Sequence, residues 1–206
     1  MKSRPAVIVL AAGKGERFHG SAHKLSQPLA GGSVLGTTLR HAIASHLPVV
    51  VVTTEPLADI ARRSVAARDV IVLPEAGAGS AAYLGMGHSI ASGVSARANA
   101  GGWLILPADM PLVRPATLVA AAAQLEHHAV VCAHYKGRRG HPVGFSPELY
   151  SELVVLAGDE GARRLVARYP ALGLELDDPG VLVDVDTEAD LERVRRILGE
   201  APLQTR

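Results

Sequence analysis

Short runs rich in valine, isoleucine and leucine alternate along most of this chain with longer stretches whose apolar residues recur at helical spacing. This alternation is typical of β-α-β units, in which helices bury both faces of a parallel sheet. The expected strands are residues 6–10, 49–53, 70–73, 103–106 and 130–134, and the expected helices are residues 34–46, 56–67, 85–98 and 115–127. The sequence therefore predicts an α/β fold with an open, mostly parallel sheet and helices on both faces.

The pattern changes after His134. Residues 137–145 are polar and rich in turn-forming residues, which predicts a turn rather than a strand. The remaining expected elements are helices at 146–156 and 161–169, short strands at 172–176 and 181–183, and an amphipathic helix at 187–199 that Thr187 opens. With 206 residues in all, we expect a single domain over 1–200, in halves of about 1–110 and 111–200, and a tail at 201–206.

Charge and composition argue against several classes of partner. The 21 basic residues nearly balance the 20 acidic ones, and aromatic residues make up 3%. The chain therefore has neither a strong positive field nor many stacking side chains for nucleic acid. The apolar run near the N-terminus is too short for a signal peptide or a membrane span, and the single cysteine, Cys132, cannot form an internal disulfide. We expect a cytoplasmic protein that binds neither nucleic acid nor membrane.

The turn after the first expected strand has the composition of a phosphate-binding loop. Gly13 and Gly15 allow the backbone to approach a phosphate chain closely, and Lys14, Arg17 and Lys24 can neutralise its charge. Phe18 stands where a dinucleotide-binding fingerprint has its third glycine, and no Walker A loop is present. A nicotinamide oxidoreductase is therefore disfavoured.

Residues 10–18, with Lys24 and the Pro-Leu pair at 28–29, resemble the L-A-A-G-x-G-x-R-[MF]…K…P-L signature of the NTP-transferase superfamily, which has a Rossmann-like fold of the GT-A type. The resemblance implies that Arg17 holds the departing pyrophosphate and that Lys24 contacts the α-phosphate. It also implies nucleotide binding by the loop residues Leu10, Ala11, Ala12, Gly13 and Gly15. By the same resemblance, residues 1–110 form the nucleotide-binding half and residues 111–200 the acceptor-side half.

Aspartates follow two of the expected strands. Asp109 comes after 103–106 between two prolines, and Asp184 and Asp186 alternate before the last helix. Taken alone, such residues more often cap turns and helices than bind a cation. The two segments resemble the family's G-D-M-P and D-[IV]-D-T-P-E-D-L motifs, the second only in part. That resemblance implies a catalytic Mg²⁺ on Asp109 and Asp186, with Asp184 in reserve.

Three further segments resemble those of molybdopterin cytidylyltransferases. The resemblance of the G-M-x-x-S segment implies that Gly85, Met86 and Ser89 lie beside the base. The R-G-H-P-V and G-D-x-G-A-R segments supply candidate contacts for an anionic acceptor, namely Arg138, Arg139, His141 and Arg163. Without the resemblance, the first segment would be interpreted as a helix with small residues on its packing faces. The two later segments would be interpreted as turns with solvated charges.

The predicted activity is transfer of CMP from CTP to the phosphate of molybdopterin, with Mg²⁺ and release of pyrophosphate. A molybdenum hydroxylase would receive the product. The alternatives are a guanylyl- or other nucleotidyltransferase with a different phosphorylated acceptor, and a non-enzymatic nucleotide-binding or cofactor-delivery module. The remaining histidines, His23 among them, complete no metal-ligand spacing, and we expect them on the solvated surface.

Overall fold

The computed structural model describes residues 3–13, 15, 17–18, 22–74 and 85–200. The predicted tail at 201–206 and Lys14 lie outside the described residues. The strands are β1 (Ala6–Ala11), β2 (Pro28–Leu29), β3 (Gly32–Ser33), β4 (Val49–Thr54), β5 (Val70–Leu73), β6 (Trp103–Pro107), β7 (Val130–Tyr135), β8 (Arg138–Phe145) and β9 (Ala171–Glu175). The α-helices are α1 (Val34–Ala44), α2 (Glu55–Arg62), α3 (Gly85–Ser95), α4 (Pro115–Gln124), α5 (Tyr150–Leu153), α6 (Arg163–Arg168) and α7 (Glu188–Ile197). Within the described residues, the 3₁₀ helices are η1 (Lys24–Ser26), η2 (Ala67–Asp69), η3 (Pro147–Leu149) and η4 (Pro179–Leu182).

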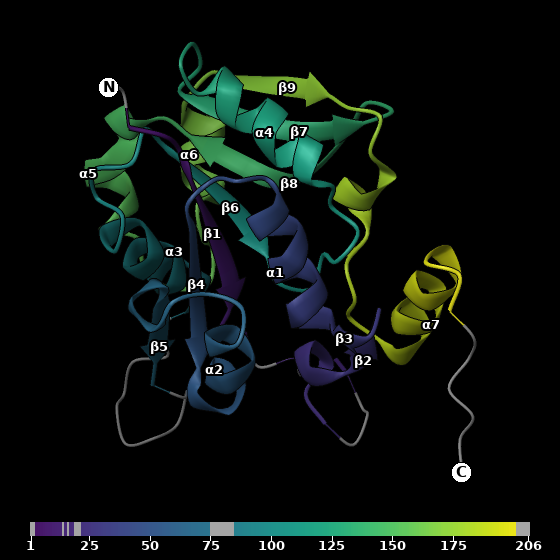
Figure 1. Cartoon of the computed structure of the whole chain (residues 1–206). Coiled ribbons are helices and arrows are strands. Elements are labelled where there is room, and N and C mark those ends of the chain that lie inside the picture. The colour runs from purple at the N-terminus through teal and green to yellow at the C-terminus, as the bar shows by residue number, and fades with distance from the viewer. Residues whose placement is uncertain (1–2, 14, 16, 19–21, 75–84, 201–206) are drawn as a thin grey trace.

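Seven of the strands form one sheet in the order β5-β4-β1-β6-β8-β7-β9 (Figure 1). Six of them run in the same direction, and β8 is antiparallel to its neighbours β6 and β7. The predicted α/β fold with a mostly parallel sheet is thus confirmed. The chain leaves β1 toward β4 on one side and later returns to β6 on the other. This reversal opens a crevice at the carboxyl ends of these strands.

Helices cover both faces of the sheet because successive strand residues point to opposite sides. In β1, Val7 and Val9 pack with α1, α2, α4 and α7, whereas Ile8 packs with α3, α5 and α6 on the other face. These apolar side chains are fully buried. The two clusters hold the strand ends in place and thereby fix the loops that follow them.

Two sequence predictions about the second half are wrong. Residues 138–145, predicted as a turn, form strand β8. Its glycines serve close packing: a Cβ on Gly140 would lie 1.9 Å from the Val181 carbonyl oxygen, and one on Gly144 would lie 2.9 Å from Leu104. Turn-forming residues here therefore mark contacts with neighbouring elements.

Residues 181–183, predicted as a strand, belong mainly to η4 (Pro179–Leu182). The buried side chain of Asp178 accepts hydrogen bonds from the backbone N–H of Gly180 and Arg114 and from the Thr117 hydroxyl, at 2.6–3.0 Å. These bonds fold the segment into a tight turn against α4. The short β2–β3 hairpin, which the sequence pattern did not predict, lies beside α7 (Figure 1), where Arg195 donates to the Pro28 carbonyl.

The last helix begins as predicted. The Thr187 side chain accepts from the backbone N–H of Asp190, and the Asp190 carboxylate accepts from that of Thr187. This capping box fixes the chain just after Asp184 and Asp186.

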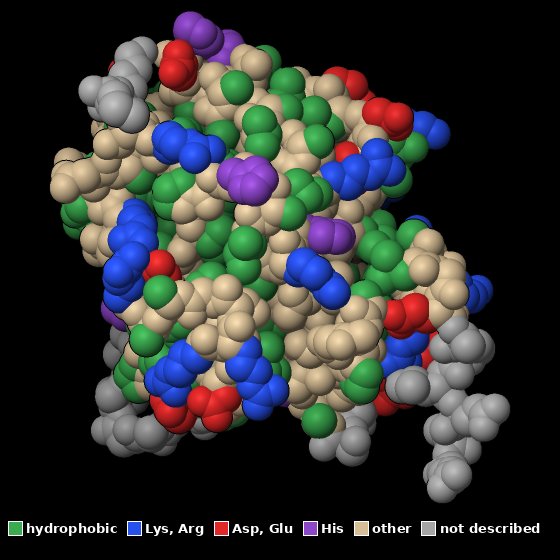
Figure 2. Space-filling view, in the orientation of Figure 1, with side chains coloured by type: hydrophobic (Ala, Val, Ile, Leu, Met, Phe, Trp, Pro, Cys, Tyr) green, Lys and Arg blue, Asp and Glu red, His purple; other side chains and the backbone are tan. Residues whose placement is uncertain are grey.

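Figure 2 shows acidic and basic side chains interspersed over one face of the molecule, in keeping with the nearly balanced charge. Among the helices of the described residues, none is long and apolar enough to cross a membrane.

Candidate functional site

A pocket of about 1020 Å³ opens beyond the carboxyl ends of the central strands. Its walls come from the loop after β1, from η1, the start of α3, the turn after β6, strand β8 and the segment between η4 and α7. Segments far apart in the sequence thus meet at the reversal point of the sheet, where open α/β folds bind their ligands.

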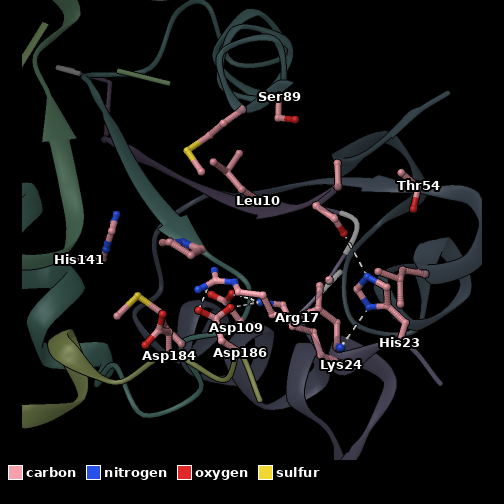
Figure 3. Close-up of a pocket in the computed structure, with 18 of the residues that line it drawn as sticks. Leu10, Arg17, His23, Lys24, Thr54, Ser89, Asp109, His141, Asp184 and Asp186 are labelled. Carbon is pink, nitrogen blue, oxygen red and sulfur yellow. Dashed lines mark hydrogen bonds and ion pairs between the residues drawn. The ribbon is translucent and has the colours of Figure 1, made fainter. Parts of the chain in front are cut away.

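Three carboxylates, those of Asp109, Asp184 and Asp186, lie together in this pocket near the cationic side chains of Arg17 and Lys24 (Figure 3). The Lys24 ammonium donates to Asp109 Oδ2 at 2.6 Å and to Asp186 Oδ1 at 2.7 Å. Arg17 Nη2 lies 2.8 Å from the second oxygen of Asp186. We call these four residues, Arg17, Lys24, Asp109 and Asp186, the charged cluster.

Local structure places each member of the charged cluster. Lys24 opens η1, and Asp109 stands in the turn directly after β6. The Asp109 carbonyl accepts from the backbone N–H of Val185, which ties the turn to the segment that carries Asp186. The aspartates are therefore held next to each other by the backbone.

The electrostatics distinguish the two aspartates of the D-V-D segment. Burial raises the pKa of Asp184, and the nearby charges of Asp186 and Asp109 raise it further. Burial alone would raise the pKa of Asp186 too, but the Lys24 hydrogen bond and the charges of Lys24 and Arg17 outweigh it, so this pKa is lowered. Asp186 therefore keeps its negative charge to a lower pH than Asp184 does.

Lys24 stays charged in this setting. Burial by itself would lower the pKa of Lys24, but the charges and hydrogen bonds of Asp109 and Asp186 outweigh burial and raise it. The side chain of Lys24 is only 11% exposed. Lys24 is therefore a cation that is hydrogen-bonded to two carboxyl groups.

The donor chemistry of the charged cluster fits a hard divalent cation. Carboxylate oxygens of Asp109 and Asp186 converge on one position, and the ammonium of Lys24 holds that position as a stand-in cation. Within the described ranges, no group of three or more His, Cys, Asp or Glu side chains could hold a metal ion. Two carboxylates leave most of the coordination shell to other oxygens, such as those of a triphosphate and water.

His23, for which the sequence assigned no role, is half-buried and connects the glycine-rich loop to η1. Its Nδ1 accepts from the backbone N–H of Leu25 at 3.2 Å, so Nε2 carries the proton and donates to the Gly13 carbonyl at 3.0 Å. A Cβ on Gly15 would lie 3.2 Å from Nε2, so the loop packs closely on the ring. His23 therefore fixes the loop relative to the charged cluster.

Replacing His23 with alanine removes both hydrogen bonds, each worth about 1 kcal/mol. We expect the affinity for a nucleoside triphosphate to fall roughly ten- to thirtyfold. His23→Asn can still cap Leu25 through its short side chain but cannot reach Gly13, so its loss should be intermediate. Equilibrium titration with a fluorescent nucleotide checks the order, and an unchanged affinity in His23→Ala would contradict the role.

The wall farthest from the charged cluster is less polar. Leu10, Met86 and Ser89 line it, with Leu10 between Ser89 and the aspartates in Figure 3. The side chain of Met86 is 54% exposed. Gly85 and Gly87 lie against the turn at 157–159, and a Cβ on either would be within 2.6 Å of that backbone. The start of α3 is thus locked in place with Met86 directed to the pocket.

Three of the four candidate acceptor contacts line the pocket: Arg138, Arg139 and His141, all on β8. Burial lowers the pKa of His141 and Arg139 lowers it further, against the opposing charge of Asp109, so the imidazole is neutral near pH 7. Arg163 does not line this pocket, since it is an exposed residue that opens α6.

The predicted nucleotide-binding residues also converge. Leu10, Ala12, Gly13 and Gly15 line the pocket, whereas Ala11 is buried in the sheet opposite Thr53 of β4. Ala11 therefore packs beneath the loop.

Sequence reasoning missed His23, Thr54 and Asp159, which also line the pocket. Thr54 ends β4, so its position at the end of an expected strand could have indicated it. Asp159 lies in the G-D-x-G-A-R segment, so that motif could have indicated it. For His23 the only signal was its place directly before Lys24.

The MobA-like NTP transferase domain matches residues 7–172 of this chain. Purine catabolism protein PucB of Bacillus subtilis (strain 168) is 32% identical over 207 residues, which cover 93% of this chain and 96% of PucB. The crystal structure of Rv0371c from Mycobacterium tuberculosis H37Rv has a TM-score of 0.79 at 26% identity and covers 94% of this chain and 99% of that chain. The Rv0371c complex with manganese has a TM-score of 0.74 at 28% identity, over 94% and 98% of the two chains.

These findings agree with the fold and the ordered motifs. The match extends from β1 to β9 and so includes both the glycine-rich loop and Asp109. One of these structures is thus a complex of Rv0371c with manganese. The resemblance to nucleotidyltransferases is confirmed, and the chain belongs to the MobA-like NTP transferase family.

Proposed function

We propose that this protein transfers CMP from CTP to the phosphate of molybdopterin, with Mg²⁺ as the cation and pyrophosphate as the leaving group. The observation that carries the proposal is the charged cluster at one end of a pocket whose β8 side presents Arg138, Arg139 and His141. Such an arrangement suits two anionic substrates that must be brought together. Its volume of about 1020 Å³ is large enough for two ligands.

In the proposed reaction an acceptor phosphate oxygen attacks the α-phosphorus of CTP, and the bond from that phosphorus to the bridging oxygen of pyrophosphate breaks. No covalent enzyme intermediate is needed, because the acceptor is already an anionic nucleophile. The chain has to align the two anions and offset their repulsion. Arg17 would hold the departing pyrophosphate, and Lys24 would meet the charge on the α-phosphate.

Asp109 and Asp186 would hold Mg²⁺, which supplies charge neutralisation of the triphosphate when bound. Arg138 and Arg139 would bind the acceptor phosphate, since arginine suits phosphate recognition. The neutral His141 would offer one donor and one acceptor to the uncharged part of the acceptor. Leu10, Met86 and Ser89 would enclose the base.

The relative in Bacillus subtilis is named as a purine catabolism protein, which bears on the enzyme that would receive the product. For this chain, that favours a molybdenum hydroxylase acting on purines as the recipient of the product. A guanylyl- or other nucleotidyltransferase with a different phosphorylated acceptor would use the same charged cluster. A delivery module without catalysis would bind nucleotide yet release no pyrophosphate.

The test is incubation of the purified protein with Mg²⁺, molybdopterin and each NTP, followed by measurement of pyrophosphate. With CTP and GTP at equal concentration, we expect mostly CMP in the product, because a site built for one pattern of donors and acceptors leaves buried groups unpaired when the wrong base enters. Preferential transfer of GMP would contradict the cytidylyl assignment, but it would still support a nucleotidyltransferase. No pyrophosphate with any NTP would favour the delivery module.

A further inference from the structure

The proposed cation site is already neutralised by side chains of the chain itself. Lys24 lies 2.6 Å from Asp109 and 2.7 Å from Asp186, and Arg17 pairs with the remaining oxygen of Asp186. These distances are those of charge-assisted hydrogen bonds. Each carboxylate of the proposed cation site is therefore paired with at least one cationic side chain of the chain itself.

The position of the Lys24 ammonium conflicts with direct cation binding. A divalent metal needs the same carboxylate oxygens that the ammonium uses, and two cations so close together would repel each other strongly. The ammonium must leave before a metal can bridge Asp109 and Asp186.

The two cationic side chains differ in how readily they can move. Arg17 is 76% exposed, whereas the Lys24 side chain is 11% exposed. Lysine is nevertheless a compact point charge on a flexible stem, and it can turn from a carboxylate to a nearby phosphate without loss of hydrogen bonding. The loop that carries Gly13 and Gly15 also lines the pocket, and a Cβ on Gly15 would lie 3.4 Å from Lys24 Cγ, so a phosphate on that loop would be a competing partner for the ammonium.

We propose that Lys24 is an exchangeable occupant of the cation site: it excludes a divalent cation from the free protein and releases the site when the triphosphate draws it away. The inference rests on the proposed function, and it adds an order of binding. The metal enters together with the nucleotide. By linkage, nucleotide must then raise the affinity for metal by the same factor as metal raises the affinity for nucleotide.

The test is direct titration with Mn²⁺, with electron paramagnetic resonance to count free and bound ion, in the full-length protein without nucleotide. Lys24→Met keeps a long side chain and removes the charge. We expect Lys24→Met to bind Mn²⁺ at least about tenfold more tightly than the unmodified protein, although its turnover falls. CTP should raise the Mn²⁺ affinity of the unmodified protein at least about tenfold, and by a clearly larger factor than in Lys24→Met, where the triphosphate oxygens add ligands but no ammonium has to be displaced.

The matched control is Arg97→Met, which removes a cation paired with Asp69 outside the pocket. It should leave Mn²⁺ binding unchanged. Lys24→Gln, which is neutral but can still hydrogen-bond to the aspartates, provides a second variant if Lys24→Met is poorly folded. An equally tight Mn²⁺ site in the unmodified protein and in the folded Lys24 variant would overturn the proposal.

The two hypotheses fail in different ways. Mn²⁺ binding is measured without turnover, so the titration reports on Lys24 whether or not a product forms. Absence of pyrophosphate release with every NTP would count against the transferase reaction alone.

Discussion

Asp109→Asn should lower nucleotidyl transfer by roughly a thousandfold or more while the protein remains folded. The substitution keeps the size of the side chain and removes its charge. Asp109 is one of two carboxylates that converge on the Lys24 ammonium, so its loss halves the negative charge available to a divalent cation. A weaker cation site leaves the charge of the triphosphate poorly compensated in the transition state.

Steady-state assays across a range of Mg²⁺ concentrations measure this effect. The Mg²⁺ requirement should shift to higher concentration, and turnover should remain low at saturation. Asp59→Asn is a matched control, because Asp59 is 82% exposed on α2 and does not line the pocket. Near-normal turnover of Asp109→Asn with the usual Mg²⁺ dependence would remove Asp109 from the site.

Thermal unfolding separates chemistry from folding in this experiment. Asp109 also contributes through its backbone, whose carbonyl accepts from Val185, and asparagine preserves that bond. We expect a small change in Tm next to a large loss of turnover.

The parallel part of the sheet could be predicted because its signal is local. Strand β1 shows a continuous apolar run, and its residues are buried on both faces by the two apolar clusters. Strand β8 could not be predicted in this way, because its sequence contains glycine, proline and arginine. Its place in the sheet depends on close contacts with Leu104, Leu125 and Val181, which are remote in sequence.

At 181–183 the sequence predicts a strand, but the structure has a 3₁₀ helix. Its apolar residues favour a strand, but the buried carboxylate of Asp178 imposes a 3₁₀ turn through hydrogen bonds to α4 and to Gly180. Tertiary hydrogen bonding overrides local propensity here. No periodicity in the sequence reports such a contact.

The charged cluster also depends on contacts between residues that are remote in sequence. The motifs indicated Arg17, Lys24, Asp109 and Asp186, and the fold brings Lys24 together with partners 85 and 162 residues away. Their mutual ion pairing depends on distances, which the sequence does not contain. The role of His23 likewise depends on a carbonyl ten residues earlier in a folded loop.

Gly140→Ala should destabilise the fold by roughly 3 kcal/mol, since overpacking in a rigid region typically has this effect. The added Cβ would lie 1.9 Å from the Val181 carbonyl oxygen and 2.7 Å from its carbon. Backbone atoms cannot rotate away as a flexible side chain can, so η4 must move off β8. For a chain of this size the loss corresponds to a fall in Tm of roughly 6 to 12 °C.

The same displacement should reach the catalytic chemistry. Val181 lies in η4, a few residues before Asp184 and Asp186, and the neighbours of Gly140 on β8 are Arg139 and His141, which line the pocket. Moving η4 therefore shifts an aspartate of the charged cluster relative to the acceptor side. A misplacement of about 1 Å can lower the rate of a positioned reaction roughly a hundredfold.

Gly32→Ala is the matched control, because its Cβ would meet only the Leu29 carbonyl oxygen at an ordinary 3.8 Å. We expect its Tm to stay within about 2 °C of the unmodified protein, in line with surface substitutions that change stability by no more than about 0.5 kcal/mol. Unfolding curves and turnover measured well below Tm distinguish lost stability from altered geometry. If Gly140→Ala has the same Tm and turnover as Gly32→Ala, η4 is not packed against β8 as described. That result would also contradict the proposed coupling between β8 and the aspartates.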